Sequence, residues 1–363
     1  MKQVVLVAGV DYEFKGVDFR VFCENRMKRL IASNKKKEDL TFILFDVLKG
    51  EQVTREVTFP GGKQTIKATP LSPSPFHAVT KANYNRTVVD GEAHYRFKDG
   101  QSGIVSAQDI YKAIRNIGRS APNTLIEVSV FSHGWMGGPI LVNSFDDGIA
   151  TTMVAGVGPV SFVLPSAARD PDDMDPRGAK DFIAPTMDPA ALTELKNAFH
   201  SDAIIWLWGC AFPRLVHEIL HKIEHHASYK DSGLGDEEMF RITNFNTEQA
   251  QTLENWIASD LGGPFPDRKR IEIKFKFLKL FFNKIVSASY AQHLANAANV
   301  KVFAALMGTY ADYDAGPLRL MSIFKGFARH FKFYQSYLGF GFDPEGRKYG
   351  AYLPGRTFPV PGP

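Results

Sequence analysis

Apolar runs that alternate with helical patterns constrain the fold of this chain more than any other feature. Two of these runs, Leu125–Phe131 and Ala203–Trp208, are almost unbroken. Such runs are typical of strands that are buried on both faces of a parallel sheet. Three more strands are predicted at Gln3–Gly9, Leu40–Leu48 and Val300–Met307. The alternation favours an α/β fold, in which a mostly parallel sheet is flanked by helices.

Helices are predicted between these strands from the spacing of apolar residues and from capping signals. Asp109 lies three residues after Ser106 and gives a capping-box start, Pro213 suits a first helical turn, and Asn246 is a typical N-cap. The predicted helices are Asp18–Ala32, Ser106–Ile117, Pro189–Phe199, Pro213–His226 and Thr247–Leu261.

Two stretches interrupt the alternation. Residues 49–100 are polar, and a hairpin is predicted there from Gln52–Phe59 and Lys63–Ala68. Residues 145–187 are rich in Asp, Pro, Gly and Ala without periodicity, which predicts a long loop. We therefore expect one α/β domain over residues 1–310, with insertions at about 49–100 and 145–187. Residues 311–363, which are aromatic and rich in Gly and Pro, are expected to form a C-terminal extension packed on it.

The composition argues against several classes of protein. A formal charge of +4 on 363 residues gives no indication of nucleic-acid binding. The two cysteines, Cys23 and Cys210, exclude a disulfide framework and fit a reducing compartment. No run of 18 apolar residues predicts a transmembrane helix. The first apolar stretch is short and leads directly to Asp11, so we expect a cytoplasmic protein or one exported without a cleaved signal peptide.

Two short motifs follow the two unbroken strands. Ser132-His133-Gly134 comes after the first and Gly209-Cys210 after the second. Catalytic groups of open α/β sheets gather at the carboxyl ends of strands, so the motifs predict a thiol nucleophile beside an imidazole base. Cys210 precedes a predicted helix, whose N-terminus is expected to lower the thiol pKa. The two glycines leave backbone N–H groups accessible, as an oxyanion hole requires.

This pair of motifs resembles that of the clan CD cysteine peptidases, the group of caspases, legumains, gingipains and clostripains. In that group His-Gly ends one strand of an α/β sheet and Ala-Cys or Gly-Cys ends the next. The resemblance covers roughly residues 1–310 in element order. It implies a caspase-like fold, a protein or peptide substrate and no cofactor. It also implies His133 and Cys210 as the catalytic dyad, the backbone N–H groups of Gly134 and Cys210 as the oxyanion hole, and Asp11 as a candidate orienting residue.

The chain also departs from this group. His133 and Cys210 stand 77 positions apart, against roughly 50 in caspases, and an insertion at 145–187 would account for the difference. The pentapeptide that surrounds the cysteine of caspases is absent, so cleavage after Asp is not implied. Many clan members cleave after a basic residue that acidic groups hold. Asp312 and Asp314, just beyond the last predicted strand, are candidates for such a substrate pocket.

A second motif favours a different chemistry. His217-Glu218-Ile219-Leu220-His221 has the spacing of a zincin helix, in which two histidines bind zinc and the glutamate activates water. Lys222 stands where the extended zincin pattern has an uncharged residue, and the motif is equally explained by a solvated basic helix face. A zinc metallopeptidase with His217 and His221 as metal ligands and Glu218 as base therefore stays an alternative.

An α/β-hydrolase is disfavoured, because its nucleophile elbow needs small residues where Trp208 and Phe212 flank Cys210. The sequence thus predicts a cysteine endopeptidase, with export as a bacterial effector as a further hypothesis. The zinc metallopeptidase and a non-enzymatic interaction module with a caspase-like fold are the alternatives.

Overall fold

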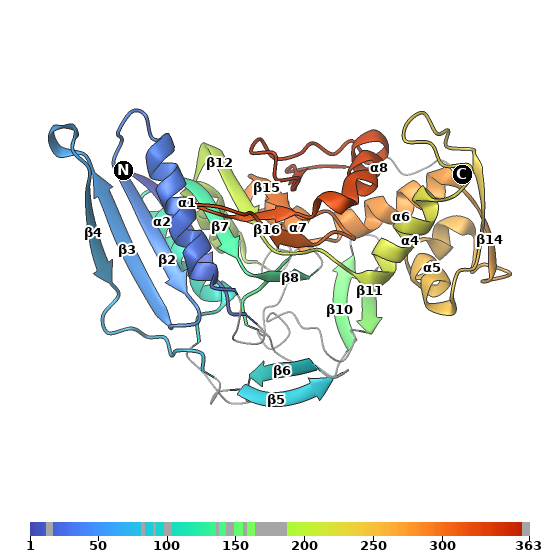
Figure 1. Cartoon of the computed structure of the whole chain (residues 1–363), viewed down its shortest axis with the longest axis horizontal. Helices are drawn as coiled ribbons and strands as arrows, with labels where there is room; N and C mark the ends of the chain where they lie inside the picture. The colour runs from blue at the N-terminus through green and yellow to red at the C-terminus, as the bar shows by residue number, and fades with distance from the viewer. Residues whose placement is uncertain are drawn as a thin grey trace.

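A computed structural model describes residues 1–11, 17–80, 84–89, 92–97, 104–135, 138–142, 149–154, 158–163 and 187–357. Eight of its strands form one central sheet: β1 (Lys2–Ala8), β2 (Leu40–Asp46), β3 (Glu51–Thr58), β4 (Thr65–Pro70), β7 (Leu125–Phe131), β12 (Phe199–Leu207), β15 (Lys301–Ala304) and β18 (Gly350–Tyr352). Their order is β18-β15-β12-β7-β1-β2-β3-β4. Figure 1 labels β15, β12, β7, β2, β3 and β4 of this sheet. The five predicted strands are confirmed as β1, β2, β7, β12 and β15, and they pair in parallel.

The five predicted helices are also confirmed, and their starts agree with the capping signals. Ser106 and Asp109 form a capping box, and so do Asn246 and Gln249. The described helices are α1 (Phe19–Ser33), α2 (Ala107–Ser120), α3 (Pro189–Ala198), α4 (Arg214–Glu224), α5 (Thr247–Leu261), α6 (Phe275–Ser287), α7 (Tyr290–Ala298) and α8 (Ala328–Leu338), with short 3₁₀ turns at Pro60–Gly62 and Lys325–Phe327.

The central strands present two different faces, because successive side chains of a strand point to opposite sides. On one side Val128, Val130 and Leu207 belong to an apolar layer with residues of α2, α3 and α7. On the other side Glu127 of β7 binds Arg26 of α1. The sheet is therefore covered by helices on both faces, with an apolar layer on one side and a charged pair within the other.

Antiparallel strands form both edges of the sheet. The predicted hairpin is confirmed as β3 and β4, which extend the sheet beyond β2. At the opposite edge β18 pairs with β15, so part of the predicted C-terminal extension completes the sheet. All six residues of β4 are exposed. Lys67 and Pro70 lie on this outermost strand and discourage further strand pairing there.

Five two-stranded antiparallel sheets complete the described strands. They are β5 (Tyr84–Val89) with β6 (Glu92–Phe97), β8 (His133–Trp135) with β9 (Gly138–Ile140), β10 (Ile149–Val154) with β11 (Gly158–Val163), β13 (Met239–Thr243) with β14 (Arg270–Lys274), and β16 (Ala311–Tyr313) with β17 (Met321–Ile323). The prediction of a continuous loop over 145–187 is wrong, because β10 and β11 pair there as antiparallel strands. Residues 164–186 lie outside the described residues.

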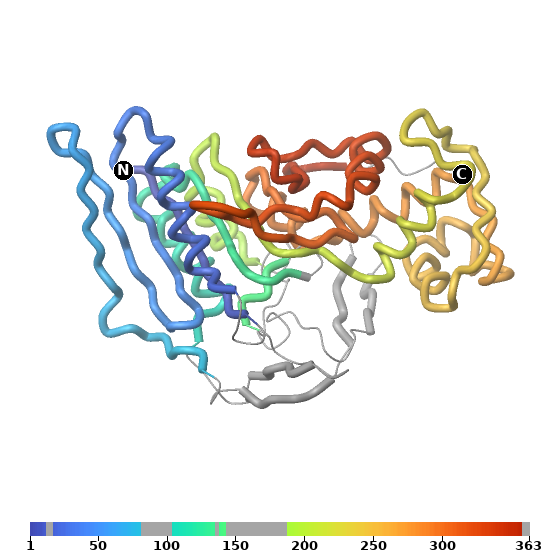
Figure 2. Tube along the Cα trace, viewed as in Figure 1, coloured from blue at the N-terminus to red at the C-terminus, as the bar shows by residue number. Residues whose placement is uncertain are grey.

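The hairpin of β16 and β17 crosses from the C-terminal part of the chain to the first helix. The Asn25 side-chain amide donates to the Arg319 carbonyl at 2.9 Å, and Arg29 Nε donates to the Leu318 carbonyl at 2.9 Å. Figure 2 shows this orange segment lying against the blue trace of α1. The hairpin therefore ties the two ends of the chain together next to the central strands.

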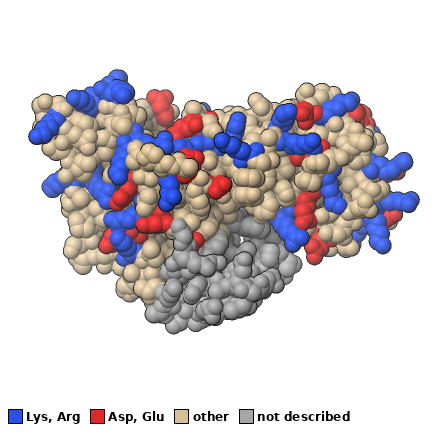
Figure 3. All heavy atoms as spheres, viewed as in Figure 1, with Lys and Arg blue, Asp and Glu red and all other residues tan. Residues whose placement is uncertain are grey.

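Charges of both signs are interspersed over the face of the molecule in Figure 3. This distribution agrees with the small formal charge of +4. Within the described ranges, no helix has both the length and the apolar character needed to cross a membrane.

Candidate active site

The two predicted motifs meet at the carboxyl ends of the central strands, because β7 and β12 are neighbouring parallel strands. The pairing of β12 with β7 continues one residue past the end of β12, because the Trp208 N–H donates to the Val130 carbonyl at 3.0 Å. A Cβ built on Gly134 would lie 2.8 Å from the Cys210 backbone nitrogen, and one on Gly209 would lie 2.9 Å from the Gly134 nitrogen. His133-Gly134 and Gly209-Cys210 are therefore in direct backbone contact, which side chains at these two glycines would disrupt.

The imidazole of His133 is held by Asp11, which lies three residues beyond the end of β1. Its Nε2 lies 2.9 Å from Asp11 Oδ1, and the two side chains are 23% and 12% exposed. The Phe19 ring packs edge-on against the imidazole, with 5.3 Å between the ring centroids. In a neutral imidazole that donates from Nε2 to the carboxylate, Nδ1 carries the lone pair and can accept a proton.

Cys210 lies in a partly buried environment that favours the thiol. Burial raises the pKa of Cys210 above its usual value, and the Ala311 N–H, which donates to the sulfur at 3.3 Å, opposes this effect. The expected lowering of the thiol pKa by a helix N-terminus is therefore wrong. Helix α4 begins at Arg214, four residues beyond the cysteine, and a dipole acts mainly within the first turn. Cys23, by contrast, is fully buried in α1.

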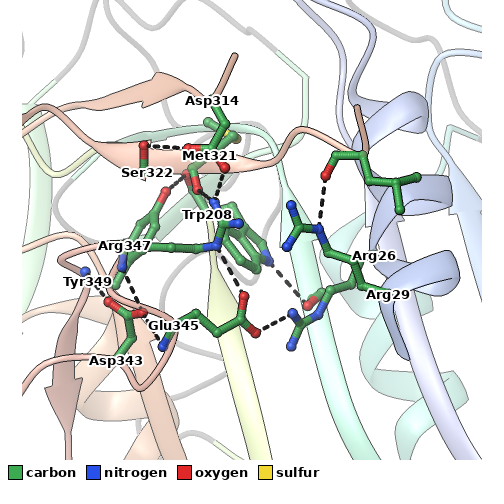
Figure 4. A network of polar contacts seen from close by, with 12 residues as sticks. Arg26, Arg29, Trp208, Asp314, Met321, Ser322, Asp343, Glu345, Arg347 and Tyr349 are labelled. Atoms are coloured by element: carbon green, nitrogen blue, oxygen red, sulfur yellow. Dashed lines mark hydrogen bonds and ion pairs between the residues drawn. The ribbon is translucent and has the colours of Figure 1, made fainter. Parts of the chain in front are cut away.

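The strand end that carries Cys210 is clamped through Trp208. The indole Nε1 donates to Ser129 Oγ at 3.2 Å, and Tyr349 Oη donates to the Trp208 carbonyl at 2.6 Å. The guanidinium carbons of Arg26 and Arg347 lie 5.7 and 5.6 Å from the centroid of its ring. Figure 4 shows Arg26, Arg347 and Tyr349 around Trp208. Its ring also stacks on that of Trp206, with 4.4 Å between centroids and 9° between planes.

A chain of ion pairs, in which Arg26, Glu127 and Arg347 are buried, lies beside this tryptophan. Arg26 makes two bonds of 2.7 Å to the Glu127 carboxylate and also pairs with Glu345. Glu345 binds Arg347 at 3.1 Å, and Arg347 in turn pairs with Asp314 (Figure 4). Burial opposes the charge on Arg26, yet its two carboxylate partners raise the pKa of this guanidinium. We call these five residues the ion-pair chain.

The two acidic residues predicted to line a substrate pocket have different surroundings. Asp314 belongs to the ion-pair chain and also accepts a hydrogen bond from Ser322 at 3.1 Å. Its carboxylate is thus already engaged within the protein. Asp312 is exposed on β16, and its carboxylate accepts the N–H of Tyr313 at 2.7 Å. The structure does not bring the two carboxylates together in one pocket.

Tyr313 is a residue near the candidate dyad that sequence reasoning missed. Its ring stacks on Phe22 of α1, with 5.5 Å between centroids. Partial burial, together with the charges of Cys210 and Asp11, raises the pKa of Tyr313 to about 12. The phenol therefore stays neutral and can donate a hydrogen bond. Tyr313 lies near the candidate dyad only because β16 packs against α1, and no local sequence pattern predicts that packing.

The residues of the zincin-like motif point in different directions. His217 Nδ1 lies 3.0 Å from His330 Nε2, whereas Glu218 accepts bonds of 2.7 Å from both Arg214 and Gln249. His221 is exposed. In the part of the chain that the structure describes, no group of three His, Cys, Asp or Glu side chains has an arrangement that could hold a metal ion. The geometry gives the metal alternative no specific support.

Comparisons were made with models of protein families, with curated proteins and with solved structures, and none of them gives a match.

Proposed function

We propose that this chain is a cysteine endopeptidase in which Cys210 is the nucleophile and His133 the general base. One observation carries the proposal: the two motifs touch at neighbouring strand ends, and Asp11 holds the imidazole there. A nucleophile, its base and a group that orients the base form the arrangement used in covalent acyl transfer.

The residues suggest the following course of reaction. The Cys210 thiol transfers its proton to His133 Nδ1 while the sulfur attacks the scissile carbonyl carbon. The developing oxyanion accepts hydrogen bonds from the backbone N–H groups of Gly134 and Cys210. His133 then gives its proton to the leaving amine, the C–N bond breaks, and a thioester to Cys210 remains. Water, deprotonated by His133, hydrolyses the thioester and restores the thiol.

The raised pKa of Cys210 determines the protonation state in which the reaction begins. The resting nucleophile is a thiol rather than a preformed thiolate, so proton transfer to His133 accompanies the attack. Alkylation of Cys210 by iodoacetamide should therefore accelerate as the pH rises through the alkaline range. Cys23 is an internal control, since it is fully buried and should stay unmodified in the folded protein. A rate of Cys210 alkylation that is already at its plateau at mildly acidic pH would contradict a nucleophile that rests as a thiol.

The proposal is tested with the full chain on an unstructured protein such as casein, with cleavage followed by mass spectrometry. Cys210→Ala and His133→Ala should abolish cleavage, and Cys23→Ala should retain it. Asp11→Asn should reduce kcat with little change in KM, because it weakens the orientation of the base. Cleavage that survives Cys210→Ala but stops with a chelator would instead support a metallopeptidase at His217. Absence of cleavage, together with an unreactive Cys210, would support an interaction module. Export as a bacterial effector stays a prediction.

A further inference from the structure

Four aromatic rings cluster next to the candidate nucleophile, and two of them are exposed. Tyr310 and Phe324 stack with 5.3 Å between centroids and 13° between planes, and they are 37% and 41% exposed. The buried Phe327 supports Tyr310 edge-on at 4.8 Å, and Phe212 packs against Tyr310 at 5.5 Å. We call these four residues the aromatic platform.

Backbone contacts join the aromatic platform to Cys210. The Ala211 N–H donates to the Thr309 carbonyl at 3.0 Å, and the Ala311 N–H donates to the Cys210 sulfur at 3.3 Å. Tyr310 stands between these two attachment points. The Phe324 N–H donates to the Tyr310 carbonyl at 3.1 Å, which fixes the second exposed ring beside the first. The platform is thus a preformed surface whose position relative to the sulfur is set by main-chain bonds.

Two adjacent, exposed aromatic rings differ from the isolated apolar side chains that are common on protein surfaces. Another apolar group that covers them gains burial and ring contacts, and the supporting rings lose little freedom because they are already packed. The hollow lined by Val130, Gly209, Cys210 and Ala304 has no room for a water molecule. A substrate side chain near the sulfur therefore finds its apolar contact on the platform rather than in that hollow.

The charges along the chain near the platform do not select a charged side chain. Lys325 directly follows Phe324, and Asp312 lies two residues after Tyr310, so both signs are present. Asp314 is engaged by Arg347 and offers no second carboxylate. These observations argue against the acidic pocket for a basic residue that the sequence suggested.

We propose that the aromatic platform is a substrate subsite that binds an aromatic or large aliphatic side chain within two residues of the bond that Cys210 cleaves. Two residues of an extended peptide span about 7 Å, which matches a surface attached directly to the nucleophile. This inference rests on the proposed peptidase function and adds the class of its substrates: peptides selected by an apolar side chain rather than by a charged one.

The test uses the full chain and a peptide library derived from a digested proteome, with cleaved bonds identified by mass spectrometry. Phe, Tyr, Leu or Met should be enriched within two residues of the cleaved bonds. Tyr310→Ser and Phe324→Ser should lower kcat/KM at least about tenfold for a peptide with Phe at the preferred position. For the same peptide with Ala there, the change should stay within about twofold. Leu71→Ser, which removes an equally exposed apolar side chain beside the distant β4, is the control and should match the wild type.

Each of the following outcomes would overturn the inference. They differ in whether the proposed peptidase function also fails. A preference for Arg or Lys that disappears in Asp312→Asn would replace the aromatic platform with an acidic subsite. Cleavage without side-chain preference, or an unchanged preference in both Ser variants, would overturn the subsite and leave the peptidase standing. A chain that cleaves no peptide and whose Cys210 resists alkylation would overturn both the peptidase and its subsite.

Discussion

Gly134 and Gly209 lie where the backbones of the two motifs touch. A Cβ on Gly134 would come 2.5 Å from the Cys210 carbonyl oxygen and 2.8 Å from its nitrogen. Real Cβ atoms do not approach backbone this closely, so the two loops must separate if a side chain is added. The geometry of a candidate oxyanion hole made of Gly134 and Cys210 N–H groups depends on this contact.

We expect Gly134→Ala to reduce peptidase activity at least about 100-fold, since displacement of about 1 Å at a reacting centre has effects of that size. The free energy of unfolding should fall by about 1–3 kcal/mol, as is typical of overpacking. Gly235→Ala is the matched control, because its Cβ would meet nothing closer than 3.8 Å. Activity assays and denaturant unfolding measure both effects. A Gly134→Ala variant with normal activity would argue against this contact as part of the site.

At the residue scale, the sequence predicts the groups that stand at strand ends but not their environments. His133, Cys210 and Asp11 each follow an apolar run, so strand topology suffices to bring them to one edge. The raised pKa of Cys210 results from burial, and the N–H of Ala311, which opposes this effect, lies 101 positions away in the sequence. Local patterns contain no information on such burial, and for this reason the expected direction of the pKa shift was wrong.

Helices α2 and α3 approach each other closely at a glycine. A Cβ on Gly118 would collide with the carbonyl of Glu194. Alanine at a helix position is ordinarily stabilising by about 1 kcal/mol relative to glycine. Here the collision with the neighbouring helix outweighs that propensity, so glycine is required by packing.

We therefore expect Gly118→Ala to lower the free energy of unfolding by about 1–3 kcal/mol, opposite in sign to the helix propensity. Lys112→Ala, at an exposed position of the same helix, should change it by less than about 0.5 kcal/mol. Denaturant unfolding of the three proteins measures the difference. A stabilised Gly118→Ala variant would show that the two helices can separate at little cost.

Helices α4 and α8 are joined by a chain of two imidazoles and a carboxylate. His217 contacts His330, and His330 Nδ1 lies 2.9 Å from Glu224 Oε2. Burial, and then the neighbouring His330, lower the pKa of His217 below its ordinary value of 6.5. The folded state therefore disfavours the protonated form, and the stability that depends on neutral His217 is present above about pH 6.5 and is lost as the pH falls.

The thermal unfolding midpoint should accordingly fall between about pH 7.5 and about pH 5.5, and the fall should be smaller in His217→Gln. The glutamine keeps a polar side chain but does not titrate. His200→Gln, at a half-exposed position of β12, should follow the wild type at both pH values. Scanning calorimetry at the two pH values measures the midpoints. Identical falls in the His217→Gln variant and the wild type would mean that folding does not change the proton affinity of His217.

At the scale of the whole molecule, the ion-pair chain connects parts of the sequence that are far apart. Arg26 of α1 and Glu345, which are 319 positions apart, pair directly, and Glu127 of β7 binds the same guanidinium. Removal of one member of a buried ion pair leaves an uncompensated charge, which costs more than the pair contributes.

Glu127→Gln should therefore lower the free energy of unfolding by about 3 kcal/mol, since Arg26 loses its main partner. Glu38→Gln is the control: its pair with Lys2 has side chains that are 40% and 43% exposed, so this variant should unfold like the wild type. Chemical denaturation measures both values. A Glu127→Gln variant as stable as the control would show that Glu345 alone suffices to compensate Arg26.

The sequence predicts the fold of the whole molecule better at its centre than at its edges. Five parallel strands and five helices follow from apolar periodicity and caps. The antiparallel β18 was not predicted, because Gly350–Tyr352 is too short to give a pattern and pairs with β15 only through tertiary contact. The β10–β11 hairpin was missed because its short strands lie among residues typical of loops. Long-range pairing, rather than local propensity, decides such elements.

The face-to-face stack of Trp206 and Trp208 gives the protein a built-in optical reporter. Two indoles whose ring centroids lie 4.4 Å apart and whose planes are 9° from parallel interact electronically, so their near-ultraviolet circular dichroism depends on how the two rings are placed relative to each other. Trp208 immediately precedes Gly209-Cys210, so the signal senses the very segment that presents the sulfur. An inhibitor bound to Cys210 can therefore be followed in solution without a label.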